Sequence, residues 1–545
     1  MTAQATIRYP LRHFHMCCGS GAGAKGFNMS NPRVGNLVGD WICLGGVDVD
    51  LDGLQDFEKL TGVKGTQMDL FTRDQYTRFH GKEPPVGWKE ATPNDIRRAA
   101  QNVTPHACFI SSPCKGATGL LPESMAGTPR YQALNELTLR CIWLMLEAWK
   151  DDPVPLILFE NVPRLKTRGR HLLDQIGKLL SLFGYAFSET AHDCGEIGNL
   201  AASRKRFLLI ARHIEKVPAF IYEPPKHSLR PIGDVLSRMP LAGDVEAAGP
   251  MHRVPSLQWQ TWVRLALVKA GGDWRSLNEY AIADGYLRDL VIIPEYRSGY
   301  LGVHQWEDSS GTVTGRAGPT NGAFSVADPR VAQSARWNHG QQFGVHHWID
   351  SCGTIPGQQS PGQGRFAIAD PRPGMAKKKG DPYLTGGHYG VVRYDQSAAV
   401  VSASARHDNG RFSVADPRLP EPNERLTCII RSLDNTWHRP FTTLELAALQ
   451  SFFDPEDHWS ADPIDALEIK RRHEMELFQL YGSNDSDWRQ RIGNAVPPKA
   501  AKAIADVMGT TLLLVATGET FVLSNIPIWV RPIAMAISVS SYAAQ

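Results

Sequence analysis

Residues that could support nucleophilic chemistry stand at separate places in the first half of the chain. Cys114 follows an apolar run and a proline in "ISSPCKGATG", and a glycine-rich stretch comes after it. Glu160 and Asn161 end the apolar run of "PLILFENVPRL", where a carboxyl group is costly to bury unless it is used. A thiolate nucleophile needs nearby positive charge and partial exposure. Cys114 is therefore either such a nucleophile at a strand end or a buried structural thiol.

Positive charge is available in "ASRKRFLLIA", which holds Arg204 and Arg206 at the start of a predicted strand. The two-residue period of a strand places both side chains on one side. Two guanidinium groups there suit an anion or a carbonyl-rich ring. Glu160 has a plainer interpretation as the cap of the following helix.

A ligand-binding turn is predicted in "HMCCGSGAGAKGFN", which contains Gly19-x-Gly21-x-x-Ala24 and continues to Gly26. Glycines in such a turn let the backbone approach a ligand that faces the start of a helix. Taken alone, this motif is a weak signal.

Acids that could hold a ribose or a base should follow the turn, at the ends of the next strands. Asp48 and Asp50 lie in "GGVDVDLDG", and Asp69 lies in "GTQMDLF". The alternative for each of them is a surface aspartate in a turn.

The elements that must position these residues alternate in the first 225 residues between short apolar runs and helical patterns. The runs "WICLGGVDV", "ACFISSP", "PLILFENV" and "KRFLLIA" are separated by "YQALNELTLRCIWLMLEAWK" and "HLLDQIGKLLSLFG". This alternation predicts an α/β domain with a parallel, doubly wound sheet, whose ligands bind at the carboxyl ends of the strands.

The region 226–435 has a different composition and contains three copies of one unit, at about 299–330, 341–372 and 387–418. Each copy ends in a phenylalanine followed by two residues and Ala-Asp-Pro-Arg. Two β-like halves joined by a glycine-rich loop predict a β-rich module. The Asp-Pro-Arg ends are either turns with an internal ion pair or contacts to a nucleic acid.

The chain then returns to helical patterns over 436–510 and ends in an extension, 511–545. "TTLELAALQSFF" predicts a capped helix, and "PPKAAKAIADVMG" predicts a helix with proline in its first turn and Gly509 at its end. The apolar extension is interrupted by Glu519 and Arg531 and is expected to form a hairpin around "TGE" rather than a membrane span.

Composition restricts the class of protein. The 545 residues carry a net charge of +2, and 42% of them are hydrophobic, which is typical of a soluble globular chain. None of the nine cysteines forms a C-x-x-C pair, so no zinc site is expected. Without a signal-like start, the expected location is a reducing cytoplasm, of a bacterium or a phage-infected cell.

Four segments in order, "SSPCKG", "FENV", "RKR" and "RIGNAVPP", resemble the sequential motifs of the DNA cytosine-5 methyltransferases. The resemblance covers roughly residues 10–215 and 436–508, and as an ordered set it is highly specific. The chain departs from the family pattern at Cys17, where phenylalanine is usual. It also departs at Lys115 and Ala202, where glutamine is usual.

The resemblance implies an S-adenosylmethionine-dependent, Rossmann-like methyltransferase domain with a second, smaller β-rich domain that recognises DNA. It implies methyl transfer to C5 of a flipped cytosine through a covalent bond from Cys114 to C6. Glu160 would hold N3 and the exocyclic amine, Arg206 would hold O2, Arg204 would support the loop or a phosphate, and Asn161 would order the backbone beside Cys114. The implied cofactor-binding residues are Gly19, Gly21, Gly26, Asp48, Asp69 and Asn494.

The expected partner is duplex DNA, bound by a monomer without a metal or a membrane. A cognate restriction endonuclease, as in a restriction–modification pair, is a further candidate. Two other functions stay open: a catalytically silent DNA-binding relative, and an RNA cytosine-5 methyltransferase with similar chemistry.

Overall fold

The computed structural model describes residues 6–113, 128–219, 221–257, 265–272, 389–401, 410–418, 436–459 and 477–517, with 221–222 described by backbone alone. It also gives the backbone of several two-residue strands elsewhere. The chain divides into two compact units. The first contains 1–253, 395–405 and 442–545, and the second contains 254–394 and 406–441.

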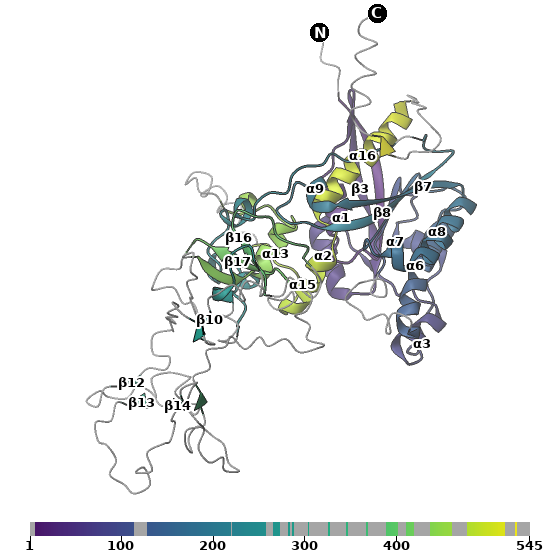
Figure 1. Ribbon diagram of the computed structural model, residues 1–545. Helices are drawn as coiled ribbons and strands as arrows, with labels where there is room; N and C mark the ends of the chain where they lie inside the picture. The colour runs from purple at the N-terminus through teal and green to yellow at the C-terminus, as the bar shows by residue number, and fades with distance from the viewer. Residues whose placement is uncertain are drawn as a thin grey trace, which may run out of the picture. The chain divides into compact units, whose positions relative to one another are not determined.

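An eight-stranded sheet forms the centre of the first unit, in the order β2-β3-β1-β5-β6-β8-β7, with β4 paired to β3 (Figure 1). The strands β4, β3, β1, β5 and β6 are parallel, and the α/β prediction is confirmed. Their bounds are β1 Ile7–Met16, β2 Arg33–Val34, β3 Leu37–Asp48, β4 Thr66–Gln67, β5 Ala107–Ile110, β6 Leu156–Asn161, β7 Tyr185–Asp193 and β8 Lys205–His213.

The sheet is not parallel throughout, which the sequence pattern did not show: the short β2 runs antiparallel to β3. Strand β8 runs antiparallel to both β6 and β7. The connection from β7 to β8 covers only 194–204, whereas a parallel crossover needs a dozen or more residues, usually with a full helix. The short connection therefore forces the chain to turn back.

Strict alternation along the central strands divides the hydrophobic core between the two faces of the sheet. On β6, Ile157 and Phe159 pack into one cluster and Leu156 and Leu158 into the other. The same alternation occurs on β5 and β8, because successive side chains of a strand point to opposite faces. Near-continuous apolar runs were thus the correct signal for strands covered on both sides.

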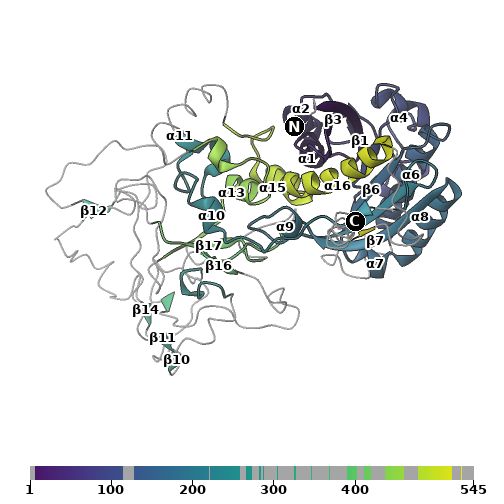
Figure 2. The same cartoon turned by 90° about the horizontal axis from the view of Figure 1, so that it is seen from above.

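Helices cover both faces, as Figure 2 shows from above. Helices α1 and α16 pack against each other over one face, and α6 contacts α3, α4 and α8 over the other. The helices of this part are α1 Ala22–Asn28, α2 Leu51–Thr61, α3 Arg73–His80, α4 Pro93–Ala99, α6 Pro129–Ala148, α7 Leu165–Arg168, α8 Arg170–Leu182, α9 Cys194–Ile197 and α16 Pro498–Thr517.

The prediction that the last helix ends at Gly509 is wrong. Helix α16 continues to Thr517, so the predicted extension begins inside it. A side chain at Gly509 would lie 2.4 Å from Pro32, and the glycine therefore allows close packing rather than ending the helix. The "TGE" turn and the rest of the extension lie outside the described residues, apart from the backbone of β19, Trp529–Val530.

The helical stretch Asp485–Thr517 has the length and hydropathy of a membrane span, but 56% of its apolar window is buried inside the protein. The alanines in the first turns of α16 pack in one cluster with residues of α1 and the sheet, as in the core helix of a globular domain.

The first unit extends further than the predicted boundary at 225. His252 bonds through Nδ1 to the Thr442 hydroxyl at 3.0 Å and through Nε2 to the Pro240 carbonyl at 3.0 Å, which ties 226–253 to the segment after the repeats. The remaining elements here are β9 Ile221–Tyr222, α10 Gly233–Leu236, α11 Val245–Ala248, η2 Pro250–His252, α13 Thr443–Leu449, η7 Pro455–Asp457 and α15 Asp485–Asn494.

The second unit contains a three-stranded sheet built on the third repeat. Strands β16 (Val391–Arg393) and β17 (Ser413–Asp416) are parallel, and β18 (Trp437–Pro440) runs antiparallel to β17. Short strands occur in the other two copies and in a preceding pair: β10 Ile282–Ala283, β11 Tyr286–Leu287, β12 Val303–His304, β13 Ser325–Val326, β14 Val345–His346 and β15 Ala367–Ile368.

In the third copy, Asp416 is fully buried, and its carboxylate forms ion pairs with Arg418 at 3.1 Å and with Arg439 at 2.7 Å. Its Oδ1 also accepts the backbone N–H of Arg418 at 2.9 Å. The Asp-Pro-Arg end is thus a turn closed by an internal ion pair, one of the two interpretations that the sequence left open.

Candidate active site

A buried carboxylate–guanidinium pair lies at the carboxyl end of β6. Glu160 Oε1 is 2.6 Å from Nε of Arg206, and Glu160 Oε2 accepts the Ser111 hydroxyl at 2.6 Å. Glu160 is 4% exposed and Arg206 is 8% exposed. β6 and β8 are antiparallel neighbours, and this places the last residues of β6 beside the first residues of β8. The two predicted residues are thus brought together.

The chain that leads to Cys114 is attached to the same strand end. Asn161 donates through Nδ2 to the Ser112 carbonyl at 3.5 Å, and its Oδ1 accepts the Val162 N–H at 2.8 Å. The Ser112 hydroxyl bonds to Thr138 of α6 at 2.8 Å. Asn161 is therefore bonded to the backbone just before Pro113.

Cys114 itself lies outside the described residues, together with Lys115 and the rest of 114–127. Its separation from the fixed chain is still bounded by covalent geometry. Cys114 follows Ser112 by two residues, so the two Cα atoms are at most about 7–8 Å apart.

The two arginines are not used alike, contrary to the prediction that they share one side of a strand. β8 begins at Lys205, and Arg204 precedes it. Arg204 is fully buried and donates from its two terminal nitrogens to the carbonyls of Val401, at 2.8 Å, and Gly493, at 2.7 Å. Its guanidinium group thus joins two distant backbone segments.

Asp193, which sequence reasoning missed, fixes the segment before β8. Its Oδ1 accepts the N–H groups of Gly195, at 2.8 Å, and Arg204, at 2.6 Å, and its Oδ2 accepts the Ser203 hydroxyl. The sequence signal was an aspartate at a helix N-cap, the usual position for such bonds.

The predicted glycine turn connects β1 to α1. Gly19 and Gly21 have φ of +50° and +80°, values that side chains disfavour. A Cβ at Gly21 would lie 2.8 Å from Phe57 of α2. Gly26 has another role, because it lies inside α1 and a Cβ there would meet the Pro498 carbonyl of α16 at 2.4 Å. Gly26 therefore allows helix packing rather than ligand approach.

Asp48 at the end of β3 holds this turn in place. Its Oδ2 accepts the Gly19 N–H at 2.8 Å, and its Oδ1 accepts the Asp50 N–H at 3.0 Å. Burial raises the pKa of the Asp48 carboxyl, while these two hydrogen bonds act against the rise. Next to it, Val49 is 61% exposed and Asp50 is exposed, so the strand end presents an apolar and an acidic side chain to solvent.

Asp69 follows β4 and is half-buried. Its Oδ1 accepts the Phe71 N–H at 2.9 Å, and its Oδ2 accepts the indole N–H of Trp88 at 3.2 Å. A carboxylate oxygen has two acceptor positions, so Asp69 retains capacity for a further donor.

Asn494 is the last residue of α15 and is exposed. Its helix is held by Arg491, whose Nε lies 2.8 Å from the buried Asp56 of α2. Asp56 also accepts the Tyr481 N–H at 2.6 Å, and burial raises the pKa of its carboxyl to about 6. Sequence reasoning missed this pair, although a charged residue inside the helical "RQRIGN" was a signal.

Cys17, at the departure from the family pattern, is a thiol of low reactivity. It has φ of +53°, and its Sγ lies 3.7 Å from Sγ of Cys141. The contact with Cys141 and burial raise the pKa of Cys17 well above its ordinary value. Within the part of the chain that the structure describes, no group of three or more His, Cys, Asp or Glu is arranged to hold a metal.

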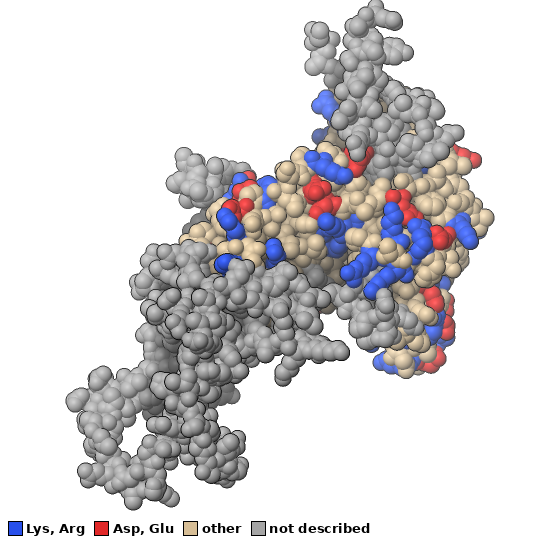
Figure 3. Space-filling model, viewed as in Figure 1, with Lys and Arg blue, Asp and Glu red and all other residues tan. Residues whose placement is uncertain are grey.

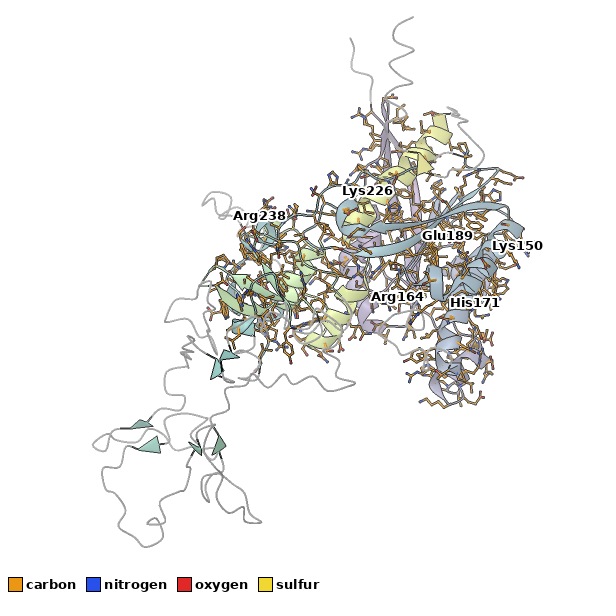
Figure 4. The ribbon with its side chains drawn as sticks, in the orientation of Figure 1. Lys150, Arg164, His171, Glu189, Lys226 and Arg238 are labelled. Atoms are coloured by element: carbon orange, nitrogen blue, oxygen red, sulfur yellow. The ribbon has the colours of Figure 1, made fainter. Side chains whose placement is uncertain are left out.

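The segment that follows Glu160 in the sequence carries a basic surface. Figure 3 shows Lys and Arg side chains gathered over α7 and the start of α8, and Figure 4 labels Arg164 and His171 from this stretch. The exposed members are Arg164, Lys166, Arg168 and Arg170. Arg170 is compensated by Glu189 at 2.7 Å and Asp174 at 2.9 Å, so the positive charge is concentrated at α7.

Comparisons with known proteins give only distant likenesses. No protein-family model matches the chain, and no curated protein sequence matches it. A solved methyltransferase of Entamoeba histolytica, EhMeth, is 11% identical with a TM-score of 0.44, over 92% of this chain and 98% of that one. The Dnmt2 methyltransferase of S. pombe is 14% identical with a TM-score of 0.40, over 93% and 99%. A putative DNA modification methyltransferase encoded within an E. coli prophage is 12% identical with a TM-score of 0.41, over 92% and 99%. At these values the likenesses carry no argument about function.

Proposed function

We propose that the chain is an S-adenosylmethionine-dependent DNA cytosine-5 methyltransferase. The observation that supports this most is the buried pair of Glu160 and Arg206 beside the strand end that leads to Cys114. A pyrimidine needs complementary groups along one edge and a nucleophile at the ring face, and this set supplies both kinds.

The chain's residues would act on a cytosine that has left the duplex, because none of them can reach a stacked base. Arg206 would donate to O2. Glu160, in its protonated form, would accept from the exocyclic amine through one oxygen and give its proton to N3 through the other. The Cys114 thiolate would then form a bond to C6, which breaks the aromaticity of the ring and makes C5 nucleophilic. Once C5 has taken up the methyl group, loss of the C5 proton to water and elimination of the Cys114 thiolate would restore the aromatic ring.

The residues of the glycine turn fit an adenosyl cofactor. Gly19 leaves the backbone open at the end of β1, Gly21 lets the turn pack against Phe57, and Asp48 keeps acceptor positions besides its two backbone bonds. The exposed Val49 would offer an apolar contact to a purine, and Asp69 would accept its amine. S-adenosylmethionine would supply the electrophilic methyl group. Asn494 is proposed as a further contact through the resemblance alone.

A nucleic-acid substrate agrees with the charge near the site. Arg164 and Lys166 are exposed and closely follow Glu160 and Asn161 in the chain. Basic side chains at this position would neutralise phosphates beside the flipped base.

Expression in a host without cytosine-5 methylation, followed by bisulfite sequencing of its DNA, tests the proposal. We expect one or more DNA sequences in which cytosine is protected, and none after Cys114→Ala or Glu160→Gln. Protection in RNA alone would replace DNA by RNA as substrate, and protection in neither would contradict the proposed activity.

A further inference from the structure

The segment between α3 and α4, residues 81–92, returns to the end of β4 and takes no part in the mechanism proposed above. Its Trp88 donates the indole N–H to Oδ2 of Asp69 at 3.2 Å. Asp69 is the residue to which we assign the purine amine of the cofactor. A side chain outside the four motif segments thus bonds directly to the proposed cofactor site.

A tight turn brings this indole to Asp69. The backbone N–H of Trp88 donates to the Pro85 carbonyl at 3.1 Å, and Gly87 between them has φ of +91°. These are the features of a type II turn, whose third position needs a positive φ and usually holds glycine. Among the described residues, no atom lies within 4 Å of a Cβ built at Gly87, so only the backbone conformation requires the glycine.

Arg140 of α6 holds the chain on both sides of the bonded pair. Its Nε donates to the Leu70 carbonyl at 2.9 Å, and one of its terminal nitrogens donates to the Ala91 carbonyl at 3.1 Å. Leu70 directly follows Asp69, and Ala91 comes three residues after Trp88. One planar guanidinium group therefore fixes the two stretches of chain relative to each other.

The indole ring also packs against α3. The ring centroids of Trp88 and Tyr76 are 5.4 Å apart, and the guanidinium group of Arg73 lies 5.8 Å from the centre of the Trp88 ring. The backbone N–H of Arg73 donates to Glu90 at 2.8 Å, which ties the segment to the first turn of α3. These contacts leave the half-buried indole little freedom to rotate, so its N–H stays directed at Asp69.

Asp69 is consequently a carboxylate whose two oxygens each meet a fixed N–H donor. Oδ1 accepts the Phe71 N–H at 2.9 Å, and Oδ2 accepts the indole. A carboxylate offers about four acceptor positions and no donor. Because rotation about its Cβ–Cγ bond would break at least one of these bonds, the remaining acceptor positions keep fixed directions. They accept only from a group that itself donates.

We propose that Trp88 is a positioning residue that makes the cofactor site selective for an amine on the purine. This inference rests on the proposed function, because it takes Asp69 as the contact to the purine. The amine of adenine donates to the fixed carboxylate, whereas the carbonyl that hypoxanthine carries at the same position only accepts and is repelled. Without the indole, the carboxylate can turn away from the purine, and the distinction weakens.

Isothermal titration of the full chain with S-adenosylhomocysteine and with S-inosylhomocysteine tests this role. The two compounds differ in having an amine or a carbonyl on the purine. The unchanged protein should bind the adenosyl compound at least about thirtyfold more tightly. Trp88→Phe keeps an aromatic ring but loses the N–H, and the ratio of the two affinities should fall about three- to tenfold.

Two further variants separate positioning from a general loss of stability. Trp459→Phe removes a second half-buried indole, whose N–H donates to the Ala247 carbonyl at 3.3 Å, and should leave the ratio unchanged. Gly87→Ala retains the indole but strains the turn that carries it, and should lower the ratio by a smaller factor than Trp88→Phe. A partly unfolded sample would bind both compounds less and keep their ratio, so unfolding does not imitate the expected effect.

The outcomes distinguish this inference from the proposed function. If the unchanged protein prefers the adenosyl compound and Trp88→Phe keeps the same ratio, the role of Trp88 is overturned and the proposed function stands. Equal affinity of the unchanged protein for both compounds would likewise overturn the selectivity alone. If the unchanged protein binds neither compound, the proposed cofactor is contradicted, and this inference with it.

Discussion

Two neighbouring regions of the first unit use arginine in opposite ways. Around Arg206, one nitrogen meets Glu160 and another meets the Lys205 carbonyl at 3.0 Å, beside the chain that leads to Cys114. Around Arg204, both terminal nitrogens are bound to carbonyls and the side chain is fully buried. The first arrangement can exchange partners with a ligand, whereas the second holds the chain together.

Arg206 belongs to a charged pair with Glu160, whereas Arg204 links two segments of backbone. Glu160 keeps acceptor positions for a base edge, while both terminal nitrogens of the buried Arg204 are already bonded to carbonyls. The two-residue spacing predicted the same role for both arginines. Strand β8 begins at Lys205, however, so only Arg206 lies on it.

The same substitution at the two arginines tests this contrast most strongly. Arg204→Lys cannot bind the Val401 and Gly493 carbonyls together, and we expect a loss of about 2–4 kcal/mol in the free energy of unfolding. Arg206→Lys keeps a positive charge beside the buried Glu160, so stability should fall less than in Arg204→Lys while kcat/KM falls at least about tenfold. Denaturant unfolding and a methyl-transfer assay measure both. Equal effects at the two positions would remove the distinction.

A third buried polar group, the histidines His13 and His15 of β1, should make the stability of the fold depend on pH. His13 Nε2 donates to Asn28 Oδ1 at 2.9 Å, and its Nδ1 bonds to Nε2 of His15 at 2.8 Å. Desolvation lowers the pKa of His13 to about 4 and lowers the pKa of His15 well below its ordinary value. In the folded chain His13 therefore stays neutral down to about pH 4. In the unfolded chain the same residue binds a proton below about pH 6.5.

Stability should consequently fall as the pH falls from about 6.5 to 4. For His13 the loss between pH 7.5 and 4.5 is roughly 2–3 kcal/mol. His13→Gln should be less stable at pH 7.5 but lose that much less on acidification. Urea unfolding of both proteins at the two pH values gives the difference, and parallel losses would show that His13 does not contribute.

Asp69 provides a smaller and more local effect. Asp69→Ala should weaken binding of S-adenosylhomocysteine by roughly 1.5–3 kcal/mol, about ten- to a hundredfold, because one charged acceptor is lost. DNA affinity should not change. Isothermal titration measures the former, with Asp74→Ala on the exposed face of α3 as a matched control. Unchanged cofactor affinity would transfer the role to another acid, with Asp50 the first to test.

The smallest expected effect concerns the basic surface at α7. If Arg164 and Lys166 contact phosphates, the double alanine variant should reduce the slope of log K against log salt by up to about two units. Lys150→Ala, at an exposed lysine that pairs with Glu147, should leave the slope unchanged. A slope unaltered in both variants would show that α7 is only a solvated face.

Sequence patterns predicted the fold and part of the site for identifiable reasons. Alternation of apolar runs with helical stretches indicated a sheet covered on both faces, and strand ends indicated Glu160 with its neighbour Asn161. These features are local, because a residue's place on a strand sets its direction.

Features that depend on distant contacts were not predictable. The bonds of Arg204 join residues far apart in the chain, and the segment 395–405 belongs to the first unit through backbone bonds that have no sequence signal. Gly509 resembled a helix end, but its partner Pro32 is at the other end of the chain. Glycine in a helix ends it or permits close packing, and only the fold decides which.

The proposed mechanism requires that Cys114 form a covalent bond to cytosine during methyl transfer. DNA with 5-fluorocytosine at the methylated site tests it directly, since fluorine at C5 blocks the final elimination. We predict a stable protein–DNA adduct whose peptide map places the bond on Cys114, and none with Cys114→Ala. An adduct on another cysteine, or methyl transfer by Cys114→Ala, would contradict the claim.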